Sequence, residues 1–257
     1  MIINNNISAI NTRNQLFNTN AASSKSMEKL SSGKRINRAA DDAAGLSISE
    51  KMRAQIRGLN QAARNAQDGI SLIQTAEGAL DEVSNMLVRL KELAVQKVNG
   101  TYNSEDIANL KLEMDSLADE IDNIFVNTKF NGSSVLTSSV GIIISDDGKT
   151  ALTIKATSGT SITGLSSISE VGDIETAIEK VNMARATYGA SQNRLESTVR
   201  NLKTTSENLQ AAESRIRDTD MAEEMSTFTK NNILIQAGTA MLAQANQAPQ
   251  NVLSLLR

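Results

Sequence analysis

The sequence predicts a mainly α protein, an elongated antiparallel helical, coiled-coil rod with a small β-hairpin segment. Apolar residues recur at seven-residue intervals over long stretches, which is typical of helices that pack along a shared seam. The only proline is Pro249, so the chain before it contains no residue whose ring and missing N–H break a helix. Aromatic residues make up 2% of the chain, which favours thin layers of aliphatic side chains over a large globular core.

The clearest repeat lies in residues 174–216. Positions three residues after its large members are small, as at Ala177 and Ala184, so a neighbouring helix can approach closely. At about 1.5 Å per residue, one helix over this stretch would be about 64 Å long. The large members are Ile174, Val181, Tyr188, Leu195, Leu202, Leu209 and Ile216.

Two further helices are predicted to share that seam. A long helix should run from Ala43 to about Val98, and a third should begin with Ser104 as its N-cap and lie antiparallel to the second. Glycines inside the long helix, among them Gly58 and Gly69, suggest close helix contacts. The apolar positions are Leu59, Ala66, Ile73, Leu80, Leu87 and Ala94 in one helix, and Ile107, Leu110, Met114, Leu117, Ile121 and Ile124 in the other.

A β segment is expected at about residues 130–170, where Ser, Thr and Gly dominate. Residues 140–145 and 151–156 are rich in strand-forming residues and flank an Asp-Asp-Gly turn, which predicts a hairpin. We therefore expect a helical rod domain over residues 43–217 that includes this segment. A terminal coiled-coil domain would consist of residues 1–42 and 218–257.

Both ends of the chain are poor in charge. Residues 1–24 carry one charged side chain, Arg13, and residues 231–256 carry none, although Gln and Asn are spread through the second stretch. Such a composition suits neither a membrane helix nor a solvent-exposed one, and it favours burial against other copies of the chain. The alternative is that the two ends pair within one molecule. The candidate packing residues are Ile3, Ile7, Ile10 and Phe17 in one stripe, with Ile235, Leu242, Val252 and Leu255 near the other end.

Composition argues against several functions. The chain contains no Cys and no His, which removes the thiolate, the imidazole base and the usual zinc ligands, so we expect no enzyme activity, metal or cofactor. The net charge of −3 argues against nucleic-acid binding, and Lys34, Arg35 and Arg38 are interpreted as a solvated bend. No apolar run is long enough to cross a membrane. Residues 1–6 lack the features of a secretory signal.

Five motifs resemble bacterial flagellin. They are MIINNN at residues 1–6, LSSGKRIN at 30–37, AAGLSI at 43–48, ASQNRL at 190–195 and QNVLSLLR at 250–257. The resemblance covers roughly residues 1–136 and 170–257, and the chain lacks the large outer domains that many flagellins carry between these regions.

The resemblance implies a structural subunit of the flagellar filament, a homopolymer that assembles through its terminal helices into the propeller used for motility. It implies an extracellular location, export through the flagellar type III apparatus without a cleaved signal peptide, and termini that pair as an inner coiled coil. Its implied partners are an export chaperone at the C-terminal segment, the filament cap and the hook-junction proteins. Neither nucleic acid nor a membrane is an expected partner.

Alternatives within the structural class are a hook-filament junction protein and a flagellin-like secreted structural protein. Some flagellins carry catalytic inserts, which would make the chain an enzyme within the filament, but the short middle segment leaves no room for one.

The resemblance also implies recognition by the host flagellin-sensing Toll-like receptor. The run LVRLKELAVQ at residues 87–96 resembles the receptor-binding motif. Arg89 and Leu93 are four residues apart and share a helical face, and Glu113 is expected opposite them on the next helix. These three residues are the candidate recognition patch. The same face also suits packing against a neighbouring protofilament.

Overall fold

The computed structural model describes residues 6–156 and 171–255, with side chains as far as residue 247. The chain forms two compact units, one of Met1–Arg53 with Leu209–Arg257 and one of Ala54–Asn208. We call them the terminal unit and the middle unit. The sequence placed the domain boundaries at breaks between helices, at residues 42/43 and 217/218, whereas the units change within helices.

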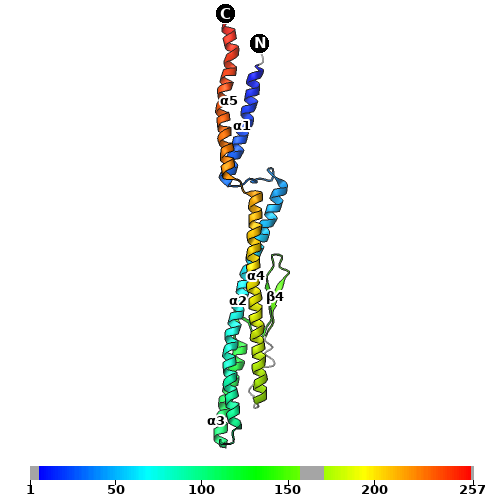
Figure 1. Ribbon diagram of the computed structural model, residues 1–257, viewed down its shortest axis with the longest axis vertical. Coiled ribbons are helices and arrows are strands. Elements are labelled where there is room, and N and C mark those ends of the chain that lie inside the picture. Colours follow the sequence, from blue (N-terminus) through cyan, green and yellow to red (C-terminus); the bar gives the residue numbers. More distant parts are fainter. Residues whose placement is uncertain (1–5, 157–170, 256–257) are drawn as a thin grey trace. The chain divides into compact units, whose positions relative to one another are not determined.

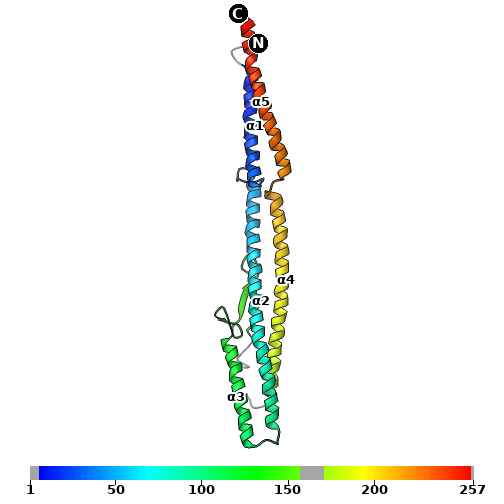
Figure 2. The same cartoon turned by 90° about the vertical axis from the view of Figure 1, so that its left-hand side faces the viewer.

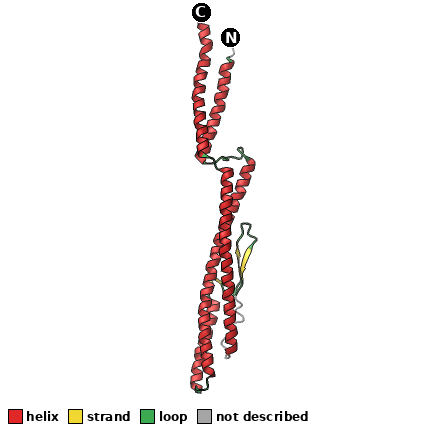
Figure 3. Cartoon of the chain, viewed as in Figure 1, coloured by secondary structure: helices red, strands yellow, loops and turns green. Residues whose placement is uncertain are grey.

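The described residues are mainly helical, as predicted (Figure 3). Four short strands lie between the third and fourth helices within the described residues 128–156. The part of the expected β segment at residues 157–170 lies outside the described residues. In chain order the elements are α1 (Ile7–Ser32), α2 (Ala43–Val98), α3 (Ser104–Asn127), β1 (Lys129–Phe130), β2 (Ser133–Ser134), β3 (Val140–Ile143), β4 (Ala151–Ile154), α4 (Val171–Arg217) and α5 (Met221–Leu255).

In the terminal unit α1 and α5 lie side by side along their lengths (Figure 1). The Asn6 side-chain amide donates to the carbonyl of Ala245 at 2.7 Å, near one end of the pair. Near the other end, Lys29 Nζ lies 3.4 Å from a Glu224 carboxylate oxygen. Low numbers on α1 thus meet high numbers on α5, so the two helices are antiparallel. The two terminal helices, α1 and α5, therefore pair within one molecule.

Local signals define the ends of α1. The Asn6 side chain accepts a hydrogen bond from the Ala9 N–H at 3.1 Å and caps the first turn. At the other end Gly33 has φ of +68°, a left-handed conformation that glycine adopts without a Cβ clash, and its N–H donates to the Lys29 carbonyl at 2.8 Å.

In the middle unit α2, α3 and α4 pack along one another (Figure 2). Polar contacts show that α2 and α4 are antiparallel. Lys91 lies 2.8 Å from Glu175 near the start of α4, whereas Ser206 near its end donates to Asn60 at 3.1 Å. The third helix returns along α2 after a short loop, as predicted. Its N-cap is Asn103 rather than Ser104, because the Asn103 side chain and Asp106 form a reciprocal capping box.

The predicted apolar positions form the core of the middle unit. All six repeat positions of α2 are buried, and Leu80, Leu87 and Leu195 are each fully enclosed. On α4 the repeat is buried from Ile174 to Leu202, whereas Leu209 and Ile216 in the terminal unit are half-buried. Phe125 is also fully buried; the sequence analysis missed it because it follows the repeat position Ile124.

The predicted hairpin consists of β3 and β4, paired antiparallel with Val140 opposite Ile154. It packs on the helices through Ile142, Leu152 and Ile154, all of which belong to the core. A Cβ at Gly69 would lie 2.1 Å from the Cδ1 of Ile142, so a larger residue there would require the Ile142 side chain to shift. The close contact at Gly69 is therefore with the hairpin and not mainly with another helix. Gly78 has open space around it.

Candidate assembly surface

The face of α1 that meets α5 carries small polar residues. Thr19, Ser23 and Ser26 are its buried residues, spaced four and three apart as a seven-residue repeat requires. Ser23 donates to the Asn232 side chain at 3.5 Å. Such short side chains let the two helix backbones approach closely, and they place little apolar area in the seam.

The α5 side of the seam follows the same spacing. Ile235, Gly238 and Leu242 are each half-buried and lie three and four residues apart. A Cβ at Gly238 would lie 2.8 Å from the Cδ1 of Leu16 on α1, so the helices are in close contact at this level. Ile235 and Leu242, two of the sequence candidates for packing against other copies, thus lie on the side of α5 that faces α1 in the same molecule.

The stripe predicted on α1 lies on its outer side. Phe17 is 73% exposed, and Ile7 and Ile10 are also exposed. At about 100° per residue, Phe17 is roughly 120° around the helix from Ser23, so it points away from α5. The structure therefore leaves this stripe uncovered in a single chain. The remaining candidates Ile3, Val252 and Leu255 lie outside the described side chains.

A groove of about 460 Å³ runs between α1 and α5 on one flank of the seam. Leu16, Leu234, Gly238 and Met241 form much of its lining, and the polar lining residues are uncharged. Leu234 and Met241 are exposed. The stripe on α1 and this groove thus place exposed apolar side chains on the outer surface of the helix pair, among uncharged polar residues and the exposed Arg13.

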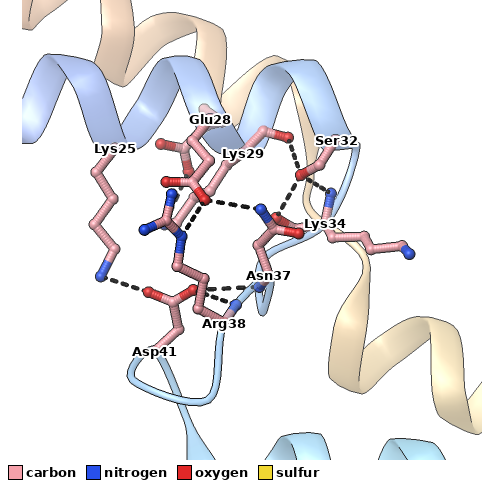
Figure 4. Close-up of polar contacts among 9 residues, drawn as sticks. Lys25, Glu28, Lys29, Ser32, Lys34, Asn37, Arg38 and Asp41 are labelled. Carbon is pink, nitrogen blue, oxygen red and sulfur yellow. Dashed lines mark hydrogen bonds and ion pairs between the residues drawn. The ribbon is translucent and has the colours of Figure 1, made fainter.

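The loop between α1 and α2 is held against α1 by a polar network (Figure 4). Lys25 Nζ lies 2.9 Å from an Asp41 carboxylate oxygen. The backbone N–H groups of Arg38 and Asn37 donate to the second oxygen at 3.1 and 3.2 Å. The hydrogen bond from Lys25, helped by the two backbone donors, lowers the pKa of Asp41 from 3.8 to about 2. The carboxylate is charged at neutral pH and orders the loop.

The basic run in this loop was interpreted as a solvated bend; Arg35 and Arg38 are indeed exposed, and they also make polar contacts within the terminal unit. Arg38 Nε and the Asn37 side-chain amide both donate to one Glu28 oxygen at 2.8 Å (Figure 4). Donation from Asn37 and Arg38 lowers the pKa of Glu28. Arg35 donates through Nη2 to the Ile216 carbonyl at 2.5 Å. The basic residues therefore bind the loop to α1 and to the end of α4.

A buried arginine ends α4 beside this loop. The Arg217 carbonyl accepts the Arg35 N–H at 2.7 Å, and Lys34 forms an isolated β-bridge with Asp218. Arg217 is buried and its Nη1 lies 2.5 Å from a Glu50 carboxylate oxygen. The hydrogen bond from Arg217 is the main cause of a lowered Glu50 pKa. This ion pair joins the end of α4 to the first turns of α2 within the terminal unit.

The structure brings two members of the candidate recognition patch together. Arg89 on α2 donates through Nη2 and Nε to one oxygen of Glu113 on α3, at 2.9 and 3.1 Å. Glu92 accepts a further bond from Arg89 at 3.2 Å, and all three side chains are exposed. Leu93, however, is only 1% exposed and belongs to the core. Its expected place in a surface patch is wrong, because this position of α2 lies in the core of the middle unit.

Among the described residues, no helix is long and apolar enough to cross a membrane. Within the same residues no three acidic side chains are grouped closely enough to hold a metal ion, and the chain has no His or Cys to add.

Comparison with known proteins gives matches over nearly the whole chain. The family "Bacterial flagellin N-terminal helical region" matches residues 3–140, and "Bacterial flagellin C-terminal helical region" matches residues 171–256. The chain belongs to the bacterial flagellin family. The two flagellin regions contain all five described helices.

Individual flagellins match from end to end. Flagellin of Bacillus subtilis (strain 168) is 50% identical to this chain, and flagellin of Halalkalibacterium halodurans is 52% identical, each alignment covering 100% of both chains. The flagellar filament 33 kDa core protein of Treponema phagedenis is 48% identical with the same coverage. A crystal structure of Bacillus cereus flagellin is 35% identical, with a TM-score of 0.48, over 58% of this chain and 94% of that chain.

Membership of this family confirms two expectations. The chain is a structural subunit of the flagellar filament, and it is not an enzyme. These relatives lend no support to a hook-filament junction protein. The filament that flagellins form is extracellular.

The sequence analysis missed the small polar seam of α1. Its signal was present in Thr19, Ser23 and Ser26, which follow the three-and-four spacing, but a search for large apolar residues passes over it.

Proposed function

We propose that subunits pack against one another in the filament through the outer stripe of α1 and the groove beside α5. The observation that carries this proposal is the exposure of Phe17, Ile7 and Ile10 on a helix whose buried face is made of Thr and Ser. A helix pair that served only its own chain would place its largest apolar side chains in the seam. On α1 the largest apolar side chain, Phe17, instead lies outside, together with Ile7 and Ile10.

The absence of charge supports the same surface. Arg13 is the one charged residue in residues 1–24, and residues 231–256 have none. Contiguous apolar surface of this kind is normally covered by another protein. The groove and the stripe are different surfaces of the helix pair. Contact between unlike surfaces does not close on itself in a dimer, and where the rotation does not close a ring it generates an open helical filament.

Replacement of Phe17 by Ser tests the proposal. Loss of a buried aromatic anchor weakens an interface by about 2 kcal/mol or more, so the critical concentration for polymerisation should rise about 30-fold. Polymerisation of the purified chain is followed by sedimentation and by negative-stain microscopy. Phe17→Leu, which keeps an apolar side chain, should polymerise much more like the unmodified protein.

A fold control separates assembly from stability. Because Phe17 is exposed in the free chain, Phe17→Ser should change the free energy of unfolding of the monomer by no more than about 0.5 kcal/mol. Normal polymerisation of a correctly folded Phe17→Ser protein would contradict the proposal.

The remaining partners are proposed from the flagellin resemblance. They are the type III export apparatus, with no cleaved signal peptide, an export chaperone, the filament cap and the hook-junction proteins. The charge-free stretch that begins at Asn231 on α5 supports the chaperone proposal, because its exposed Ile233 and Leu234 need cover in the unassembled chain. A chaperone that binds equally well after deletion of residues 231–257 would rule out this site.

A second proposed function is recognition of the monomer by the host Toll-like receptor. The exposed Arg89 and Glu113 pair, which joins α2 to α3, favours it. The pair offers a charged surface that spans both helices. If neighbouring protofilaments pack against this surface, it is covered in the filament and accessible only in the monomer. We expect the monomer, and not the filament, to bind.

Arg89→Ala should weaken receptor binding by about 2 kcal/mol, as truncation of an interface arginine does. Lys111→Ala removes an exposed cation elsewhere on α3 and serves as the control. Binding is measured with monomer whose fold has been checked by circular dichroism. Leu93→Ala is unsuitable here, because truncation of a buried leucine lowers the free energy of unfolding by about 2–5 kcal/mol and would therefore weaken binding indirectly. Equal binding by the Arg89→Ala monomer would remove the pair from the interface.

A further inference from the structure

A thioether side chain lines the groove between α1 and α5. Met241 is 62% exposed in the single chain, and Leu16, Leu234 and Gly238 line the same groove. Residues 231–256 of the chain carry no charge. The sulfur is therefore open to small reagents in the free subunit, and it stands on a surface that the proposed function covers with another subunit.

We propose that Met241 is an oxidation site that controls whether a free subunit can enter the filament. The inference rests on the proposed function and identifies a chemical regulation of that surface. The oxidant is a peroxide. Its terminal oxygen is transferred to the Met241 sulfur as the O–O bond breaks and an S–O bond forms. The thioether loses two electrons and becomes a sulfoxide, and the peroxide is reduced to water or an alcohol.

Oxidation changes the chemistry of the groove without removing a contact inside the chain. A sulfoxide is polar and accepts hydrogen bonds, whereas the thioether packs as an apolar group. Water satisfies the new oxygen in the free subunit. The hydroxyls of Thr12 and Thr19 already donate to backbone carbonyls of their own helix, at 2.8 and 2.9 Å. Assembly would move the oxygen from water into a groove lined by Leu16 and Leu234 as well as by the amide side chains of Asn11 and Gln15, and the lost hydration of a polar group opposes assembly.

Other exposed methionines provide internal controls. Met183 on α4 of the middle unit is 70% exposed, and Met225 lies beside Glu224 in the charged part of α5. Both react with the same peroxide, but neither lines the groove. Their sulfoxides report how far the reagent has acted on the chain, independently of the groove.

A partition experiment tests the proposal on the unmodified chain. Monomer is oxidised by hydrogen peroxide to a small extent, then polymerised, and the pellet and the supernatant are compared by peptide mass spectrometry. We expect sulfoxide at position 241 to be depleted in the pellet by roughly tenfold, and the depletion at Met183 and Met225 to be much weaker. An equal sulfoxide fraction at position 241 in pellet and supernatant would overturn the proposal.

Two further measurements test whether Met241 is the residue responsible for the peroxide sensitivity. Met241→Leu cannot form a sulfoxide and keeps a similar volume, so its polymerisation should resist peroxide, whereas Met183→Leu should stay as sensitive as the unmodified chain. Treatment of oxidised monomer with methionine sulfoxide reductases should restore assembly. Peroxide sensitivity that persists in Met241→Leu would also overturn the proposal. Failure of the unoxidised, unmodified chain to form filaments would instead contradict the proposed function, so the two failures are distinguishable.

Discussion

The terminal and middle units use the same helical repeat in opposite ways. In the middle unit the repeat positions that face other helices hold large aliphatic residues, such as Leu80 and Leu195, and these are fully buried. In the terminal unit the buried positions of α1 hold Thr and Ser, and its largest apolar residue, Phe17, lies outside. One unit is thus built to be stable in a single chain, and the other keeps apolar surface for contact between chains.

The physical difference is the apolar area that each seam removes from water. Each buried methylene contributes about 0.8 kcal/mol, so a leucine in the seam contributes far more than a serine. Among the described side chains of α1 and α5, no large apolar residue is fully buried. In the rest of the terminal unit, Ile36 in the loop after α1 is buried. The helix pair should therefore be less stable than the bundle until other subunits cover it.

The largest expected effect is in the core of the middle unit. Leu80→Ala should lower the free energy of unfolding by about 2–5 kcal/mol, because it leaves a cavity where the side chain was fully enclosed. Urea unfolding followed by circular dichroism measures it. The exposed neighbour Glu82, replaced by Ala, should change stability by no more than about 0.5 kcal/mol. A loss below about 1 kcal/mol at Leu80 would mean that the middle unit is not the stable part of the chain.

A smaller effect is expected from overfilling the seam of the terminal unit. Ser26 is 4% exposed, so Ser26→Leu would force α1 away from α5 and should destabilise the pair by about 1–3 kcal/mol. Ser24→Leu on the exposed side of the same helix is the control. Hydrogen exchange of α1 and α5 amides reports the change. If Ser26→Leu instead slows exchange, the seam has room for large residues and the contrast with the middle unit is weaker than proposed.

The smallest effect concerns the loop network of the terminal unit. The pKa of Asp41 is about 2 in the folded chain and 3.8 ordinarily. Because the folded pKa is the lower one, the carboxylate stabilises the fold fully at pH values well above 3.8, and this contribution is lost as the pH falls through 3.8 towards about 2. The melting temperature of Asp41→Asn should therefore lie slightly below that of the unmodified chain at pH 6, and the gap should close in that window.

Asp119→Asn, at an exposed site on α3, is the matched control for the acid titration. The effect should be small at every pH, since ion pairs at the surface contribute little. A gap between Asp41→Asn and the unmodified chain that stays constant from pH 6 to pH 2 would show that the Lys25 contact does not stabilise the loop.

The helices, the hairpin, the core of the middle unit and the charge-poor ends could all be predicted from the sequence. These follow from local signals: the repeat of Leu80 and its partners, the turn at Asp146 to Gly148, the near absence of proline and the family motifs. Periodicity shows which residues share a helical face. A face of large aliphatic residues is strongly disfavoured in water, so it is expected to be buried. For this reason the α2 repeat was predicted position by position.

Which of two possible faces of a helix is buried within the chain could not be predicted from the sequence and depends on tertiary packing. On α1 both the face with Thr and Ser and the face with Phe17 have helical spacing. Nothing in the local sequence distinguishes a face that packs within the chain from one that packs against another chain. The burial of Leu93 likewise depends on tertiary packing. Arg89 and Leu93 are four residues apart on α2, but Arg89 is exposed whereas Leu93 lies in the core. Each choice depends on where other helices lie, and that is set by contacts between residues distant in the sequence.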